Sequence, residues 1–217
     1  MRLYLENGAV LTLRAMYNRV VRRLFNSCIA RKLPGAENIS VKPNSVISGL
    51  SHISIGKNFI AGDFLKLEAV TQFRGQTFTP RIVIGDNVSM NDFVHIGATN
   101  YIEIGNNVLM ASKIFISDHN HGLYRGDRQA QPGTPPAERP LSDDQKVIIG
   151  DNVWLGEFVS VLPGSIIGAG AIIGSNSVVS GVIPPETIAV GAPAKAVKFY
   201  NHDTACWETV SREPGKQ

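Results

Sequence analysis

The chain has 217 residues, of which 43% are hydrophobic and 18% charged, and its formal net charge is +3. This length allows one domain with an extension, the apolar content argues against disorder, and the small charge excludes nucleic acid as a partner. Cys28 and Cys206 lack the spacing of a disulfide scaffold or metal site and are predicted to be free thiols in a reducing cytoplasm. No apolar stretch of about eighteen residues is present to span a bilayer.

Residues 1–35 are predicted to form a helical segment. Apolar residues recur there at helical spacing, with arginines between them: Leu13, Met16, Val20, Val21, Leu24 and Cys28, interleaved with Arg14, Arg19, Arg22 and Arg23. Such a basic amphipathic helix can cover the open end of a β structure, which is the interpretation we favour. The alternative is weak attachment to an anionic membrane surface, which would put a cytoplasmic protein at the inner face of the membrane.

Residues 36–200 are organised by a period of six. From Ile149 the chain reads IGDNVW, LGEFVS, VLPGSI, IGAGAI, IGSNSV and VSGVIP, with an aliphatic residue opening each block and a small or β-branched residue four positions later. The pattern also appears as IGDNVS, MNDFVH and IGATNY from Ile84 and as IGNNVL, MASKIF and ISDHNH from Ile104, with two residues inserted between these groups. Fainter copies run from Ile55 to Leu67, and the start near Ile39 is weaker still.

A strict period of six matches neither a helix nor a simple strand, whereas a short strand followed by a tight corner accounts for it. Glycine follows the aliphatic residue in most blocks, where we expect it to supply the backbone freedom that a corner requires. Three hexads then make one triangular turn, and successive turns pair in parallel about 4.8 Å apart. A β-sandwich would instead place its turns irregularly, about 8 to 12 residues apart. The prediction is a mainly β fold, a parallel β-helix.

The register breaks once, between Ile116 and Ile149, and we assign residues 119–146 to a protruding loop. Long loops in compact domains are usually functional or disordered. This one holds several prolines together with Arg125, Arg128 and Arg139, a composition that suits a semi-rigid flap over an anionic ligand. A mobile surface insertion is the alternative, and the histidines at the root of the loop argue against it.

Residues 201–217 are predicted to form a C-terminal tail, since the register ends after Tyr200. A short cap around Trp207 and a disordered Pro-Gly-Lys-Gln end are expected there.

The motifs on either side of the loop carry a family resemblance. SDHNHG runs from Ser117 to Gly122, and VIIGDNVWLG follows the loop from Val147 to Gly156. With ASKIF before them, RPL at Arg139 and VGAPAKAVKFYN near the end, these blocks resemble the hexapeptide-repeat acyltransferases. Over most of the chain after residue 40 they are most similar to O-acetyltransferases of lipopolysaccharide O-antigen and capsule biosynthesis, and to galactoside and maltose O-acetyltransferases.

The resemblance implies a left-handed β-helix and a homotrimer with three sites at the subunit seams. It further implies transfer of acetyl from acetyl-CoA to a sugar hydroxyl of a surface polysaccharide or lipopolysaccharide. An alcohol needs a base to become a good nucleophile, and histidine, with an ordinary pKa of about 6.5, suits that role near neutral pH. The motif position makes His119 the base by resemblance, with His121 as second choice. Asp118 either holds an imidazole tautomer or satisfies a local backbone turn.

No acyl-enzyme is expected, because neither cysteine lies in a repeat beside a histidine; the hydroxyl would attack directly. By resemblance Asn91 hydrogen-bonds the acceptor sugar, and Asp92 and His95 are further candidates. For Asn91 and Asp92 the alternative is a structural role in a tight corner, and for His95 a coil-facing position.

The coenzyme groove also follows from the resemblance. Trp154 matches a tryptophan at the acetyl-CoA end of the site, with a subunit contact as the alternative. The groove would be lined by Gly156, Glu157, Ser175, Ser180 and Gly181, of which Glu157 and Gly181 depart from the residues of the galactoside enzymes. Lys195 and Lys198 match basic residues near the nucleotide phosphates, and their charge suits that contact.

Three other functions are weighed against this one. N-acetyl transfer to an amino sugar or nucleotide-linked amino sugar is the principal alternative, because a histidine base serves either nucleophile; serine is disfavoured as acceptor, since a long N-terminal helical region is missing. A zinc carbonic anhydrase would need three histidine ligands, and the spacing of His119 and His121 differs from that of the resembling anhydrases, so no metal is predicted. A purely structural scaffold would not bind coenzyme A.

Overall fold

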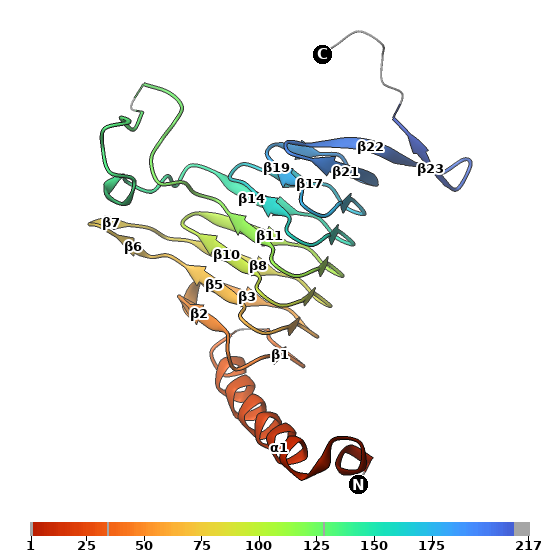
Figure 1. Ribbon diagram of the computed structural model, residues 1–217. Coiled ribbons are helices and arrows are strands. Elements are labelled where there is room, and N and C mark those ends of the chain that lie inside the picture. Colours follow the sequence, from red (N-terminus) through yellow and green to blue (C-terminus); the bar gives the residue numbers. More distant parts are fainter. Residues whose placement is uncertain (1, 34, 128, 211–217) are drawn as a thin grey trace.

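The computed structural model describes residues 2–33, 35–127 and 129–210, and it is a left-handed parallel β-helix with an N-terminal helix (Figure 1). Its three walls are here named sheets A, B and C. Sheet A comprises β1 (Ser40–Val41), β4 (Ile60–Ala61), β9 (Ser89–Met90), β12 (Leu109–Met110), β15 (Trp154–Leu155), β18 (Ile172–Ile173), β21 (Thr187–Gly191), β22 (Ala194–Asn201) and β23 (Cys206–Thr209). Sheet B comprises β2 (Val46–Ser48), β5 (Lys66–Ala69), β10 (His95–Ala98), β13 (Phe115–Ser117), β16 (Ser160–Val161) and β19 (Val178–Val179). Sheet C comprises β3 (Ile53–Ile55), β8 (Arg81–Ile84), β11 (Tyr101–Ile104), β14 (Lys146–Ile149), β17 (Ile166–Ile167) and β20 (Val182–Ile183).

The remaining elements lie outside the walls. Helix α1 spans Arg2–Ala30 with a break at Gly8, and two short 3₁₀ helices cover Leu50–His52 and Pro136–Glu138. Strands β6 (Gln72–Phe73) and β7 (Gln76–Thr77) form a small antiparallel hairpin.

The six-residue period sets the register of the walls. Trp154 pairs with Ile172 and Ser160 with Val178, so that one turn of the coil there takes three hexads. Both inward positions of each hexad are buried, as the pattern predicts: the six opening aliphatics from Ile149 to Val179 are at most 1% exposed, and the six later positions from Val153 to Ile183 at most 5%.

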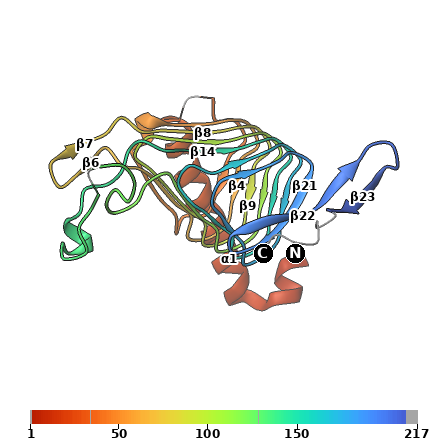
Figure 2. The ribbon, with the colours of Figure 1, turned by 90° about the horizontal axis from the view of Figure 1, so that it is seen from above.

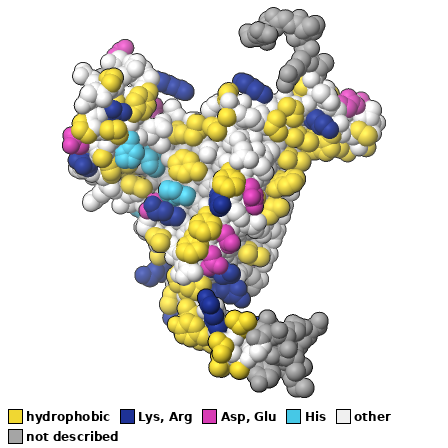
Figure 3. Space-filling view, in the orientation of Figure 1, with side chains coloured by type: hydrophobic (Ala, Val, Ile, Leu, Met, Phe, Trp, Pro, Cys, Tyr) yellow, Lys and Arg dark blue, Asp and Glu magenta, His cyan; other side chains and the backbone are white. Residues whose placement is uncertain are grey.

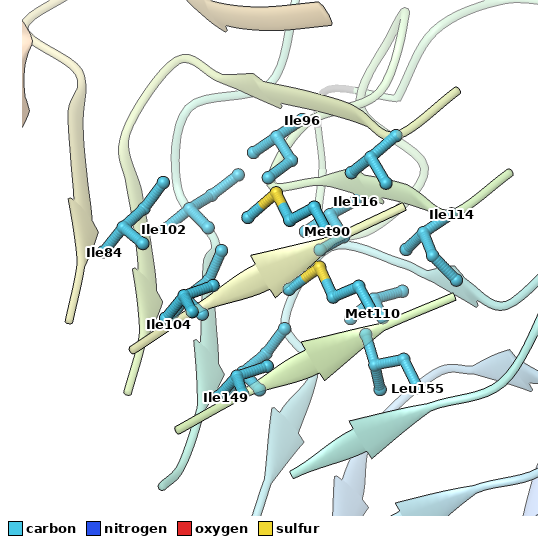
Figure 4. Packing of buried hydrophobic residues seen from close by; sticks show 14 of the residues in the cluster. Ile84, Met90, Ile96, Ile102, Ile104, Met110, Ile114, Ile116, Ile149 and Leu155 are labelled. Carbon is cyan, nitrogen blue, oxygen red and sulfur yellow. The ribbon is translucent and has the colours of Figure 1, made fainter. Parts of the chain in front are cut away.

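Identical or similar residues stack inside the prism (Figure 4). Ile84, Ile104 and Ile149 form one column, because their strands pair in register within sheet C. Met90 and Met110 form another, continued by Leu155. Parallel pairing brings the same hexad position of successive turns into contact, so a repeated sequence gives a continuous apolar core.

Asparagines stack at the corner from sheet C to sheet A. Asn58, Asn87, Asn107 and Asn152 all have positive φ, from 57° to 58°, a backbone conformation that asparagine tolerates better than most residues. Their side-chain amides form a ladder, with Asn58 donating to Asn87 (2.8 Å), Asn87 to Asn107 (3.0 Å) and Asn107 to Asn152 (3.2 Å). The ladder ties each turn to the next outside the walls.

The structural reason for the glycines in the hexads differs from the one expected from the sequence. The prediction that glycine supplies backbone freedom at the corners is wrong for Gly85 and Gly105, because the positive φ angles belong to Asn87 and Asn107, two residues later. A Cβ on Gly85 would lie 2.8 Å from the carbonyl carbon of Gly105, and one on Gly105 would lie 2.7 Å from that of Gly150. Glycine is needed there because stacked turns approach too closely for a side chain.

The length of the coil varies at one corner within the described residues. Four residues join sheet A to sheet B at 62–65, 91–94, 111–114 and 156–159, and four join sheet C to sheet A at 56–59, 85–88, 105–108 and 150–153. The corner from sheet B to sheet C instead carries the β6–β7 hairpin after β5 and the long loop after β13. Both protrude on the same side of the prism (Figure 2). We call this the insertion corner.

The two ends of the coil are closed differently. The C-terminal half of α1 packs under the first turn, where Ile29 and Leu33 join the core. At the other end, β22 and β23 continue sheet A as antiparallel strands, so the chain around Trp207 is a hairpin rather than a separate cap. The expected Pro-Gly-Lys-Gln end lies outside the described residues. No helix in the described parts of the chain is both long enough and apolar enough to cross a membrane.

Candidate functional site

Asp118 and His119 follow β13 directly, at the insertion corner. Asp118 is completely buried, and its two carboxylate oxygens accept hydrogen bonds from the next corner below. The N–H of Thr99 donates to Oδ1 (2.9 Å) and the N–H of Asn100 donates to Oδ2 (2.8 Å). These bonds compensate for the burial of the carboxylate and fix its orientation. Asp118 therefore holds the backbone of the corner after β10, in the adjacent turn of the coil.

The same carboxylate contacts the imidazole of His119, with Nδ1 2.9 Å from Oδ1 of Asp118. A carboxylate only accepts hydrogen bonds, so this contact assigns the proton to Nδ1 and leaves the lone pair on Nε2. The His119 side chain is 16% exposed, and its Nδ1 also lies 3.3 Å from Ser117 Oγ. The arrangement holds one imidazole tautomer in one orientation at the edge of sheet B.

His119 lines a cavity of about 410 Å³ over the outer face of sheet B, here called the His119 cavity. His95 and Glu68 lie on that face, with His95 Nε2 3.2 Å from Glu68 Oε2. Lys66 Nζ is 2.8 Å from the same oxygen. Thus a carboxylate, an ammonium group and a second imidazole share the cavity with His119. His95 was predicted from the sequence and faces outward; Glu68 and Lys66 were missed, although the alternation of KLEA in β5 places both on the outer face.

A smaller cavity of about 230 Å³ adjoins this one and shares Asn120, Leu162 and Pro163 with it. It is lined further by Ser180 and by Tyr124 and Arg125 of the loop, and Gly181 follows Ser180 in the chain. Together the two cavities follow the insertion corner, with polar and apolar side chains in both linings.

The neck of the 119–146 loop is an ordered two-stranded clamp. His121 and Leu141 form an antiparallel bridge, and the N–H of Gly122 donates to the carbonyl of Pro140 (2.7 Å). Further out, the Arg139 guanidinium donates to the carbonyl of Thr134 (2.9 Å). These bonds define the path of the loop, which the sequence alone left open between a flap and a mobile insertion. Arg128 lies outside the described residues.

The β6–β7 hairpin braces the loop, and the sequence analysis missed it. The side-chain amide of Gln76 makes two hydrogen bonds with the backbone of Leu141, donating to its carbonyl (3.1 Å) and accepting from its N–H (2.7 Å). The ring of Phe73 meets that of His121 edge to face, with centroids 5.3 Å apart. The signal was the Arg74-Gly75 pair between two short polar and aromatic runs, a two-residue hairpin turn.

Asn91 and Asp92 lie away from the His119 cavity within one chain. They occupy the corner from sheet A to sheet B, at the start of β10, whereas His119 lies at the end of β13. Both are exposed, and Asp92 Oδ1 accepts a hydrogen bond from the N–H of Asp63 (2.7 Å). Asp92 thus ties this corner to the same corner of the preceding turn.

The residues predicted to contact the coenzyme divide into three groups. Ser180 and Gly181 lie at the insertion corner beside His119. Trp154 is 48% exposed on the outer face of β15, and Gly156, Glu157 and Ser175 lie at the corner from sheet A to sheet B. Lys195 and Lys198 are exposed on β22. A single chain therefore brings together only the first group with the histidine.

In the described parts of the chain, no group of three or more His, Cys, Asp or Glu side chains is arranged to hold a metal ion. His95 is engaged with Glu68 and His121 with Phe73.

The chain matches a known protein family and is similar to named bacterial acetyltransferases. Residues 146–181 match a family described as bacterial transferase hexapeptide (six repeats). The chain is 48% identical over 157 residues, 72% of its length, to a protein of Escherichia coli K12 named as a lipopolysaccharide biosynthesis O-acetyl transferase, WbbJ, and covers 76% of that protein. It is 27% identical to the galactoside O-acetyltransferase of E. coli K12, over 76% of this chain and 63% of that enzyme.

Solved structures share the fold. An N-acyltransferase from Bacillus cereus, AntD, superposes with a TM-score of 0.62 at 20% identity, over 78% of this chain and 84% of that one. A galactoside acetyltransferase in complex with coenzyme A superposes with a TM-score of 0.50 at 24% identity, over 87% and 81% of the two chains. Because nearly half of the residues are shared with WbbJ across three quarters of that protein, the chain belongs to the bacterial hexapeptide acyltransferases and is an acetyltransferase of the WbbJ and galactoside O-acetyltransferase type.

Proposed function

We propose that this protein transfers the acetyl group of acetyl-CoA to a hydroxyl of a sugar used in lipopolysaccharide or surface polysaccharide biosynthesis, with His119 as the general base. The observation that carries the proposal is the fixed pair of the buried Asp118 carboxylate and the His119 imidazole, which lines a cavity together with Glu68, Lys66 and His95. The names of the relatives support the class of substrate.

Each group of the site has a role in this reaction. Bound acetyl-CoA supplies an acetyl group on a thioester, which a hydroxyl can accept directly. His119 Nε2 takes the proton of the attacking hydroxyl, whose oxygen bonds to the acetyl carbon as the thioester C–S bond breaks. Asp118 stabilises the imidazolium that results, and the imidazolium returns the proton to the departing coenzyme thiolate. Ser180, Gly181 and the loop continue the cavity along the coil and are candidate contacts for the coenzyme. Glu68, with Lys66 and His95 beside it, offers acceptors and donors to sugar hydroxyls.

We further propose a homotrimer whose sites lie at the seams between chains. Two observations support it. The predicted site residues are divided between the two edges of sheet B, with His119, Ser180 and Gly181 at one edge and Asn91 and most of the coenzyme candidates at or next to the other. An apolar column is also exposed at the edge far from His119. In that column Phe64 and Phe93 stack with centroids 4.8 Å apart, and Lys113 lies over the ring of Phe158. A neighbour that meets this edge would bring Asn91, Trp154, Gly156, Glu157 and Ser175 of one chain to His119 of another, leaving Lys195 and Lys198 for the phosphates.

The direct test is incubation of purified protein with acetyl-CoA and a panel of free, nucleotide-activated and lipid-linked sugars, with release of the coenzyme thiol and product mass both measured. Acetylation of a hydroxyl is expected. Product only with amino sugars would replace the proposal by N-acetylation, for which Glu68 could bind the amine. If no acceptor causes release of the coenzyme thiol, and the protein does not bind coenzyme A, the result would instead indicate a structural scaffold.

The His119→Ala variant tests the base. Turnover is expected to fall roughly 10²–10⁴-fold while coenzyme binding persists, because only the proton transfer is lost. His202→Ala is the matched control, since that imidazole is 69% exposed beyond the coil, and its turnover should equal that of the native protein. Near-native turnover of His119→Ala would reject His119 and make His121 the next candidate.

A further inference from the structure

Helix α1 uses one face to pack on the coil and leaves the opposite face without a partner in the described structure. Ile29 and Leu33 are 7% and 3% exposed, and Phe25 packs against the same core cluster. Asn26 accepts a hydrogen bond through Oδ1 from the N–H of Val41 (2.9 Å), which fixes the helix below the first turn. The N-terminal part of the helix extends past the end of the coil (Figure 1). On the side that faces the coil, Arg14, Arg19 and Arg22 line a cavity of about 540 Å³ together with Lys42 and Asp63.

The other face carries a continuous apolar stripe, made of side chains that are each more than half exposed: Leu13, Met16, Tyr17, Val20 and Leu24, between 56% and 68%. Their spacing of three and four residues puts them on one line along the helix, turned away from the side that Ile29 buries. The stripe shows as hydrophobic surface with basic side chains next to it (Figure 3). Exposed apolar surface of this extent usually marks an interaction site.

The charge of the helix decides between the occupants of this face. From residue 8 to the end of the helix at Ala30 there are four arginines and no Asp or Glu, namely Arg14, Arg19, Arg22 and Arg23, and Arg31 and Lys32 follow the helix directly. Helices of several copies that met along the stripe would bring arginines together without compensating carboxylates. An anionic surface would compensate the arginines and take up the apolar side chains at the same time.

We propose that α1 is a peripheral docking element for an anionic phospholipid surface. The stripe from Leu13 to Leu24 enters the boundary between head groups and acyl chains, while Arg14, Arg19 and Arg23 on its two flanks contact lipid phosphates. The helix lies in the plane of the surface, in keeping with the lack of a spanning helix in the described chain. This inference does not depend on which reaction the coil catalyses.

The test is co-sedimentation of the full chain with vesicles of phosphatidylcholine alone or mixed with phosphatidylglycerol. We expect binding only to the mixed vesicles and weaker binding as salt is raised, because arginine–phosphate attraction is screened. Arg14→Gln, Arg19→Gln and Arg23→Gln together should weaken partitioning on the order of a hundredfold. Leu13→Gln, Val20→Gln and Leu24→Gln together should weaken it by at least about tenfold.

Val20→Gln and Val182→Gln form a matched pair, since both valines are exposed, at 56% and 68%, but only the first lies on the stripe. Val20→Gln should weaken vesicle binding and Val182→Gln should not. Equal binding of all variants would overturn the proposal. The proposal would also be overturned if the native protein did not bind anionic vesicles and the apolar triple variant had a different mass in solution from the native protein. The stripe would then join copies of the chain. Acetyl transfer to a water-soluble acceptor, or coenzyme binding if no acceptor is found, checks that each variant is folded.

Discussion

Asp118 combines two roles in one side chain. Its oxygens accept bonds from the backbone of Thr99 and Asn100 and also contact Nδ1 of His119, so the corner and the imidazole are held by the same carboxylate. The orientation of the proposed base is therefore tied to the stacking of two successive turns. A residue of this kind is a positioning residue, and its loss should affect turnover more than substrate binding.

Asp118→Asn tests that role. An amide in place of the carboxylate turns one acceptor into a donor, which must face either the N–H of Asn100 or Nδ1 of His119. We expect kcat to fall about 10²–10⁴-fold, with the KM for acetyl-CoA nearly unchanged. Steady-state kinetics measures kcat and KM, and the unfolding midpoint measures the effect of the substitution on the corner that Asp118 holds. A raised KM with native kcat would place Asp118 in binding instead.

Glu68→Gln tests the proposed sugar contact. Glu68 Oε2 is shared by Lys66 and His95 inside the His119 cavity, and a neutral amide there would weaken hydrogen bonds to an acceptor. The KM for the acceptor should rise roughly tenfold and that for acetyl-CoA should stay constant. Glu103→Gln on sheet C is the matched control. If both variants behave alike, Glu68 has no part in specificity.

At the scale of the element, the corners of the coil follow two different requirements. At the corners from sheet C to sheet A, asparagine supplies the positive φ and the outer hydrogen-bond ladder, while glycine permits the close approach of the next turn. Gly85 illustrates the second requirement, because backbone of the adjacent turn fills the space where a Cβ would be.

Gly85→Ala should lower the free energy of unfolding by roughly 1–3 kcal/mol, the usual effect of forcing an extra methyl group into a packed site. Its Cβ would meet Asn106 Oδ1 at 2.6 Å and the carbonyl carbon of Gly105 at 2.8 Å. Gly133→Ala in the loop is the control, since nothing lies within 4 Å of its added Cβ and its φ is not positive. Thermal or denaturant unfolding compares them, and similar midpoints would contradict the close-approach explanation.

The sequence predicted the coil well because its determinants are local. The six residues of each hexad are enough to define one strand and one corner, so the stacked core columns through Ile149 and Leu155 follow from the period alone. Glu68, Phe73 and Gln76 could not be ranked in this way, because their importance comes from the turn stacked two levels above them. The hexad pattern is silent on any contact between insertions from different turns.

At the scale of the whole molecule, the question is whether one chain holds a complete site. His119, Ser180 and Gly181 share the insertion corner, whereas Asn91, Trp154 and Glu157 lie at or next to the opposite edge of sheet B. A trimer would have three times the chain mass of 23.5 kDa, which sedimentation equilibrium measures. If the active enzyme were a monomer, the proposal that the site lies between two chains would be wrong.

Mixing inactive variants tests the seam more sharply. His119→Ala and Asn91→Ala chains, unfolded together and refolded, would form some seams with an intact residue from each neighbour. In a random heterologous trimer about one quarter of the seams are intact, so about one quarter of native activity should return. Each variant refolded alone is the control. No recovery, with mixed trimers verified by mass, would mean that the two residues act within one chain.

The confinement of every change in coil length to the insertion corner has a consequence for how such a protein can diversify. The stacked walls carry the core and tolerate no added residue, whereas segments of any length can leave and re-enter at this one margin. Exchange of the part of the loop beyond its neck, residues 123–139, or of the short hairpin that braces it, for the corresponding segment of a relative should therefore alter which sugar is accepted, while His119 stays in place and the prism folds as before. Whatever part of the acceptor preference these insertions carry can be exchanged without altering the walls, which makes this corner the place to graft a new one.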